Sequence, residues 1–97
     1  LDIRQSALDI RSFMAGIDEA AFLKDLKTQR AVERALEIVG EAAKKLSPAA
    51  LQTLPKVPFR QMIGMRNILA HEYGKVDPQL VWQTASVDIP ALLKEIR

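Results

Sequence analysis

The strongest constraint on the fold is one long amphipathic pattern in the middle of the chain. Between residues 32 and 46, apolar side chains recur every three or four positions, which is the repeat of an α-helix with one buried face. The apolar positions are Val32, Ala35, Leu36, Val39, Ala42, Ala43 and Leu46, and the positions predicted to face away are Glu33, Glu37, Glu41 and Lys44. Such a helix must bury its stripe against other elements, so the pattern predicts a helical bundle.

Helical signals also dominate the rest of the chain. Gly16 is positioned to end the first helix, polar residues 25–28 predict a break, and Pro90 is expected to break or kink the last helix. No alternating pattern predicts a strand. The sequence therefore predicts one all-α domain over residues 1–97, an antiparallel bundle of about four to five helices. Besides the long central helix, helices are predicted over residues 2–15, 18–23, 48–52 and 59–73, and from Asp77-Pro78 onward.

Composition excludes several kinds of site. The 97 residues include no cysteine and one histidine, so neither a disulfide framework nor a metal site is predicted. The formal net charge is only +2, so a surface for nucleic acid would have to be local or shared by two subunits. No apolar run reaches the roughly 18 residues that span a bilayer. We expect a cytoplasmic protein without a signal peptide, with residues missing before Leu1, which is not a methionine.

One segment of eight residues carries most of the chemistry. Residues 66–73 (RNILAHEY) contain the only histidine and the only tyrosine of the chain. Arg66 provides a permanent cation for phosphate, and His71 is of the one residue type that ordinarily titrates near neutral pH. Together such groups can cleave an RNA phosphodiester without a metal ion.

The helical geometry of this segment favours a shared site. At about 100° per residue, Arg66 and His71 lie roughly 140° apart around the axis, whereas Asn67 and His71 are surface neighbours. Two copies of the helix, packed antiparallel, could bring both groups to one phosphate, which favours a homodimer. Arg66 is predicted to fall within an apolar side formed by Phe59, Met62, Ile63, Leu69, Ala70 and Tyr73.

Structural roles for the same residues stay open at this point. A lone histidine near a helix end is often a capping or hydrogen-bonding residue. Arg66 could form a buried ion pair with Glu37 or Glu41 of the long helix, and such a carboxylate could also hold the arginine in place. Tyr73 could be a half-buried packing residue with its hydroxyl in water.

The span from Thr28 to Trp82 resembles the HepT family, the toxin half of a bacterial toxin–antitoxin pair within the HEPN superfamily. Residues 31–42 (AVERALEIVGEA) are similar to the long helix of that family, and residues 57–67 (VPFRQMIGMRN) to the approach to its motif. Residues 66–73 match the family pattern of arginine, four residues, histidine, any residue and tyrosine. Residues 76–82 (VDPQLVW) add to the likeness, and Phe59 and Gly74 depart from it mildly.

The resemblance implies a HEPN-type homodimer that acts as a metal-independent endoribonuclease of a type VII toxin–antitoxin system, without a cofactor. By position, His71 would be the general acid or base, and Arg66 would stabilise the charge on phosphorus. Asn67 would orient His71 or the phosphate. The 2′-hydroxyl would be the nucleophile, and cleavage would leave a cyclic phosphate. The family suggests tRNA as the RNA that is cut.

The resemblance also implies a partner and a means of control. The family's antitoxin is a small nucleotidyltransferase called MntA, which transfers AMP to the motif tyrosine, here Tyr73. Phosphates added there would bring negative charge into the RNA site and block it. An alternative from another class is a catalytically inactive HEPN dimer that binds a nucleotide or a partner protein. A third reading makes Arg66 a purely structural ion-pair residue.

Overall fold

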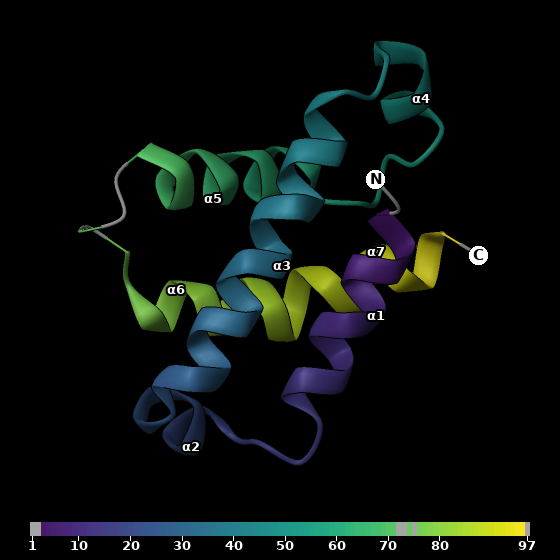
Figure 1. Cartoon of the computed structure of the whole chain (residues 1–97). Coiled ribbons are helices and arrows are strands. Elements are labelled where there is room, and N and C mark those ends of the chain that lie inside the picture. Colours follow the sequence, from purple (N-terminus) through teal and green to yellow (C-terminus); the bar gives the residue numbers. More distant parts are fainter. Residues whose placement is uncertain (1–2, 72–73, 75, 97) are drawn as a thin grey trace.

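The computed structural model describes residues 3–71, 74 and 76–96, and within these residues the chain is helical with no strand. Figure 1 shows the arrangement. The elements are α1 (Ile3–Met14), α2 (Glu19–Lys24), α3 (Leu26–Lys44), α4 (Pro48–Gln52), α5 (Phe59–His71), α6 (Pro78–Gln83), the π-helical turn η2 (Thr84–Asp88) and α7 (Ile89–Glu95).

The helices form two antiparallel pairs (Figure 1). Helices α1 and α3 run side by side in opposite directions. Helix α5 and the continuous run α6–η2–α7 also oppose each other, and both lie across α3. Because α3 contacts both α1 and α5, it is the central element of the bundle. The predicted all-α antiparallel fold is therefore confirmed, with four long helical runs and the short helices α2 and α4 in the described part of the chain.

The amphipathic stripe of α3 forms the middle of the core. Val32, Leu36, Val39 and Ala43 are buried, as the pattern predicts. Glu33 was expected to face away from the core, and this is wrong, because it is 4% exposed. Its burial is tolerated because Arg30 Nη1 donates to both carboxylate oxygens, at 3.0 and 3.1 Å.

Side-chain caps set the helix boundaries. Asp18, Ser47 and Asp77 are N-caps, and the side chain of each accepts a backbone N–H of the helix that follows. The break predicted over residues 25–28 is present but shorter, because α2 ends at Lys24 and α3 already begins at Leu26. Asp25 accepts the backbone N–H of Thr28 at 3.1 Å and its hydroxyl at 2.6 Å. These hydrogen bonds lower the pKa of Asp25. Asp25 is the N-cap of α3 and the single residue between α2 and α3.

The last helical run passes Pro90 without the predicted break. Proline lacks the N–H that bonds the fourth preceding carbonyl, and its ring crowds that carbonyl. The π-helical turn Thr84–Asp88 widens the helix just before Pro90, which then sits in the first turn of α7. The chain therefore continues as one run that packs against α1 and α5.

Helix α5 buries a slightly different face from the one predicted. Phe59, Met62 and Leu69 are buried as expected, and Met65, which was not assigned to the apolar side, is buried with them. Ala70 was assigned to that side and is exposed instead. The buried face is therefore turned toward Met65, because α5 packs on η2 as well as on α3.

No helix in the part of the chain that the structure describes is long and apolar enough to cross a membrane.

Candidate active site

Helices α3 and α5 meet at Gly40, and this contact positions Arg66. A Cβ atom on Gly40 would lie 2.7 Å from the carbonyl oxygen of Met62 and would clash with Cβ of Arg66. Only a residue without a side chain fits between the two backbones. The close approach brings the base of the Arg66 side chain against α3, beside Glu41.

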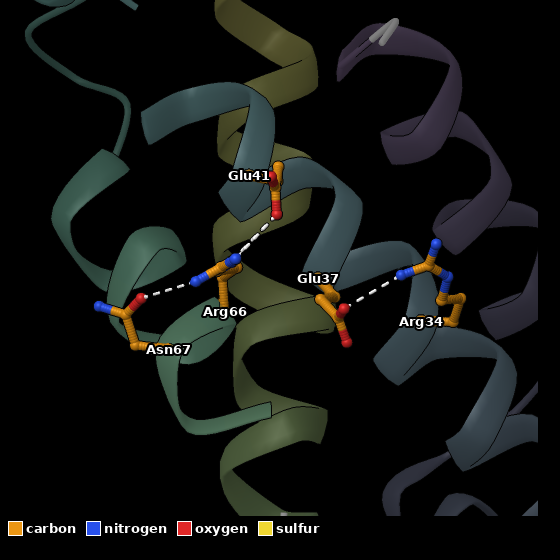
Figure 2. A network of polar contacts seen from close by, with 5 residues as sticks. All are labelled: Arg34, Glu37, Glu41, Arg66 and Asn67. Carbon is orange, nitrogen blue, oxygen red and sulfur yellow. Dashed lines mark hydrogen bonds and ion pairs between the residues drawn. The ribbon is translucent and has the colours of Figure 1, made fainter. Parts of the chain in front are cut away.

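The Arg66 guanidinium is held by two neighbours (Figure 2). Its Nε and Nη2 both donate to Oε2 of Glu41, at 3.2 and 3.0 Å, and its Nη1 donates to Oδ1 of Asn67 at 3.3 Å. The Arg66 side chain is 17% exposed and that of Glu41 is 39% exposed. A guanidinium has five N–H bonds, so two of them keep no partner among the described residues. The arginine is therefore fixed in orientation and can still donate to a further anion.

Of the two candidate carboxylates, the arginine pairs with Glu41 rather than Glu37. Glu37 accepts from Nη1 of Arg34 at 3.0 Å, one turn earlier on the same helix, and Figure 2 shows its carboxylate pointing toward that residue. Glu41 directly follows Gly40, so it lies at the level where α5 crosses. The hydrogen bond and the charge of Arg66, followed by the charges of Lys45 and Lys44, hold the pKa of Glu41 below its ordinary value of 4.5. Glu41 is thus a carboxylate at neutral pH, paired with Arg66.

His71 is exposed and is the last residue of α5. Asn67 was expected to orient His71 or a phosphate, and its Oδ1 accepts a hydrogen bond from Nη1 of Arg66. No hydrogen bond between Arg66 and His71 occurs among residues 3–71. Their five-residue separation leaves them roughly 140° apart on the helix. One chain thus presents an anchored cation and an exposed imidazole on different sides of α5, and Tyr73 lies outside the described residues.

The described residues contain no group of three or more His, Cys, Asp or Glu that could hold a metal ion. The motif segment of α5 offers the guanidinium of Arg66, the amide of Asn67 and the imidazole of His71. A guanidinium can donate two parallel hydrogen bonds to a phosphate, and an exposed imidazole can accept or donate a proton. Such a set of groups suits phosphodiester chemistry that proceeds by proton transfer.

Two glycines were not recognised as functional signals from the sequence. Gly40 lies in the middle of the most regular helical pattern, where glycine is unfavourable, and the same is true of Gly64 in α5. A glycine at such a position indicates a close approach of another group. For Gly40 the approaching group is the backbone of α5, whereas a Cβ atom on Gly64 would meet nothing within 4 Å.

Comparison with known proteins indicates the family of this chain. A family model described as Ribonuclease HepT-like matches residues 3–97. A protein of Thermococcus cleftensis named "Probable ribonuclease HepT" is 43% identical over 91 residues, which are 94% of this chain and 83% of that protein. A Methanocaldococcus jannaschii protein named "Putative RNase MJ1380" is 39% identical over 95 residues, 98% of this chain and 87% of that protein. The comparison with solved structures gave no match.

The antiparallel helices, the Arg66–His71 segment and these matches together define an all-α domain of the HEPN type with ribonuclease relatives. The chain belongs to the HepT-like ribonuclease family.

The Gly40 contact predicts opposite effects for the same substitution at two helical glycines. Gly40→Ala should lower the free energy of unfolding by about 1–3 kcal/mol, because the added methyl group forces α5 away from α3. Gly64→Ala should raise it by about 0.5–1 kcal/mol, because alanine favours the helix and its methyl group meets open space. Urea denaturation of both variants measures the difference. A stabilised Gly40→Ala variant would contradict the close contact.

The lowered pKa of Glu41 predicts how its contribution to stability depends on pH. The folded protein holds the pKa of this carboxyl below the unfolded value, so the contribution is present above the unfolded value and is lost as the pH falls through the folded one. The unfolding free energy of wild type should therefore exceed that of Glu41→Gln at pH 7, and the gap should close in acid. The control Glu37→Gln removes a more exposed pair and should show a smaller gap. A gap for Glu41→Gln that is constant down to acidic pH would refute the assignment.

Proposed function

We propose that this protein is the toxin ribonuclease of a type VII toxin–antitoxin system. In this proposal it acts in the cytoplasm as a homodimer, cleaves cellular RNA, including tRNA, without a metal ion, and is silenced by adenylylation of Tyr73. The observation that carries the proposal is the anchored Arg66, five residues before the exposed His71 in a HepT-like chain, with two N–H bonds that have no partner among the described residues.

The chemistry assigned to these residues is transesterification at phosphorus. His71 of one copy removes the proton from the ribose 2′-hydroxyl, and the 2′-oxygen bonds to the adjacent phosphorus. The bond from phosphorus to the 5′-oxygen breaks, and His71 of the second copy, as an imidazolium, protonates that oxygen. Arg66 donates hydrogen bonds to the non-bridging oxygens as negative charge accumulates on them. The products are a 2′,3′-cyclic phosphate and a 5′-hydroxyl.

Two features of the site support a dimer. In one copy, Arg66 and His71 diverge by roughly 140°, so facing copies are needed to bring both groups to one phosphate. In addition, Glu41 compensates the charge of Arg66 within each copy. Two guanidiniums and an imidazolium at one interface would give a phosphate more stabilisation than one compensated pair alone.

Cleavage of RNA by the purified protein tests this proposal. RNA should be cut in the presence of EDTA and should leave 2′,3′-cyclic phosphate ends. His71→Ala should lower the rate roughly 10²–10⁴-fold, the usual contribution of general acid–base catalysis. Arg66→Lys should also be impaired, because lysine keeps the charge but cannot donate from a planar fork.

The control is Arg11→Ala, which removes an exposed cation from α1 and should leave the rate unchanged. A His71→Ala variant with full activity would refute the mechanism. A wild-type protein without nuclease activity would favour the alternative of a nucleotide- or partner-binding dimer, which the charge compensation of Arg66 by Glu41 also suits.

Control by the antitoxin has a separate test. When the protein is produced together with an MntA-type nucleotidyltransferase, its intact mass should increase by one or more AMP groups and its nuclease activity should fall. The phosphates would place negative charge where RNA phosphate must bind. Tyr73→Phe should remain unmodified and active under the same conditions, and an AMP group on Tyr73→Phe would show that another residue is the acceptor.

A further inference from the structure

One hollow beside α5, lined by residues other than Arg66 and Glu41, has no role in the proposed chemistry. Its lining residues come from α5, α6 and η2, and it has a volume of about 390 Å³, within the range of small-molecule pockets. Met65, Ile68 and Leu80 form its apolar part. Its polar part comes from Gln61, Gln83, Thr84 and Asp88, and Gly64 completes the lining.

Gly64 keeps this hollow open. It lies inside α5, where glycine is less favourable than alanine, yet a Cβ atom there would meet no atom within 4 Å. Packing within one copy therefore gives no reason for glycine, in contrast to Gly40. A missing side chain in the wall of a hollow is what the close approach of a ligand requires.

Asp88 gives the hollow an unused acceptor. It ends the π-helical turn, a feature that is frequent at functional sites, and its side chain makes no capping hydrogen bond to α7. No residue in the described part of the chain forms a hydrogen bond or an ion pair with its carboxylate, and partial burial raises the pKa of Asp88. The carboxylate has thus lost part of its water without gaining a donor, so a ligand with N–H groups would satisfy it.

The lining also restricts the kind of ligand. Asp88 is the one charged residue among the described residues around the hollow, and no cation accompanies it. A phosphate is therefore unfavourable there, whereas a flat ring with N–H donors on its edge suits the apolar walls, the amides of Gln61 and Gln83 and the carboxylate. Guanine has two adjacent donors, N1–H and the 2-amino group, which match the two oxygens of a carboxylate.

The hollow is close enough to His71 to serve the same RNA. Gly64, Ile68 and His71 fall within roughly 60° of one another around α5. At 1.5 Å per residue, Ile68 and Gly64 precede His71 by roughly 4.5 and 10.5 Å along the axis. These separations are comparable to the span from a phosphate to the base of its own nucleotide.

We infer that this hollow is a base pocket that binds a guanine next to the phosphate cut by His71, with the Asp88 carboxylate accepting from N1–H and the 2-amino group. This inference rests on the proposed ribonuclease function and adds a sequence preference to it. Single-stranded RNA is commonly read in this way, by apolar contact with a base and hydrogen bonds to its edge.

Binding of single nucleotides to the His71→Ala variant of this chain tests the pocket without RNA cleavage. Guanosine 5′-monophosphate should shift the backbone amide NMR signals of Gly64, Ile68 and Gln83, and adenosine 5′-monophosphate should bind more weakly. Adding Asp88→Asn should weaken the binding of guanosine 5′-monophosphate roughly tenfold or more. The control Glu95→Gln on α7 should leave this binding unchanged. Equal binding of the two nucleotides, or binding insensitive to Asp88→Asn, would overturn the inference.

In the variant Gly64→Leu, a loss of nucleotide binding could not be explained by a loss of folding. Leucine should stabilise α5 and fill the hollow, so the melting temperature should rise while binding of guanosine monophosphate is lost. Unchanged binding in a stabilised variant would refute the pocket. Loss of the dimer in this variant, seen by size-exclusion chromatography with light scattering, would show that a second copy of the chain occupies the face instead.

Cleavage separates this inference from the proposed function. With the nuclease-active wild type, cuts should concentrate beside guanosine, and Asp88→Asn should relax this preference while retaining cleavage at other bases. RNA cleavage with no binding of guanosine monophosphate would overturn the pocket and leave the ribonuclease intact. Binding that depends on Asp88 in a protein that cuts no RNA would support the pocket and overturn the proposed function.

Discussion

The close contact between α3 and α5 at Gly40 is the constraint on which the candidate site depends. Without a side chain at this position, the two backbones approach until Met62 and Arg66 lie against α3. Glu41 follows Gly40 directly, so the residue that permits the contact and the residue that binds the arginine are neighbours in sequence. The close packing of α5 on α3 therefore also brings Arg66 into its ion pair with Glu41.

That ion pair shapes what the site can do. A largely buried arginine without a carboxylate would be costly. Glu41 removes this cost, and together with Asn67 it leaves two N–H bonds of Arg66 without a partner among the described residues. It also removes the net charge, so a single copy presents a rigid hydrogen-bond donor rather than a strong electrostatic attraction. The proposed dimer resolves this limitation, because it brings a second arginine and a second histidine to one interface without altering either ion pair. The low net charge of the chain, +2, is compatible with a positive surface that forms only where two copies meet.

The sequence was most informative where a structural effect is local. The caps at Asp18, Ser47 and Asp77 and the buried stripe of α3 were predictable because each depends on residues within one or two turns. The motif residues 66–73 were also evident as a candidate site. The choice of Glu41 over Glu37 was not predictable, since it depends on where α5 crosses α3. The burial of Met65 and the exposure of Ala70 likewise follow from packing on η2, and no periodicity within α5 contains that information.

Gly40 of α3 and Gly64 of α5 show that a contact between distant parts of the chain can be indicated by a single residue type in the sequence. Each costs helix stability relative to alanine, so each needs a compensating reason elsewhere in the molecule. For Gly40 the reason is internal, because a neighbouring backbone occupies the space of its side chain. For Gly64 the described part of the chain supplies no such atom, and the space opens instead into a hollow with an unpaired carboxylate. Two glycines that look alike in sequence thus differ in kind: close packing of α5 on α3 accounts for the first, whereas the proposed base pocket would account for the second.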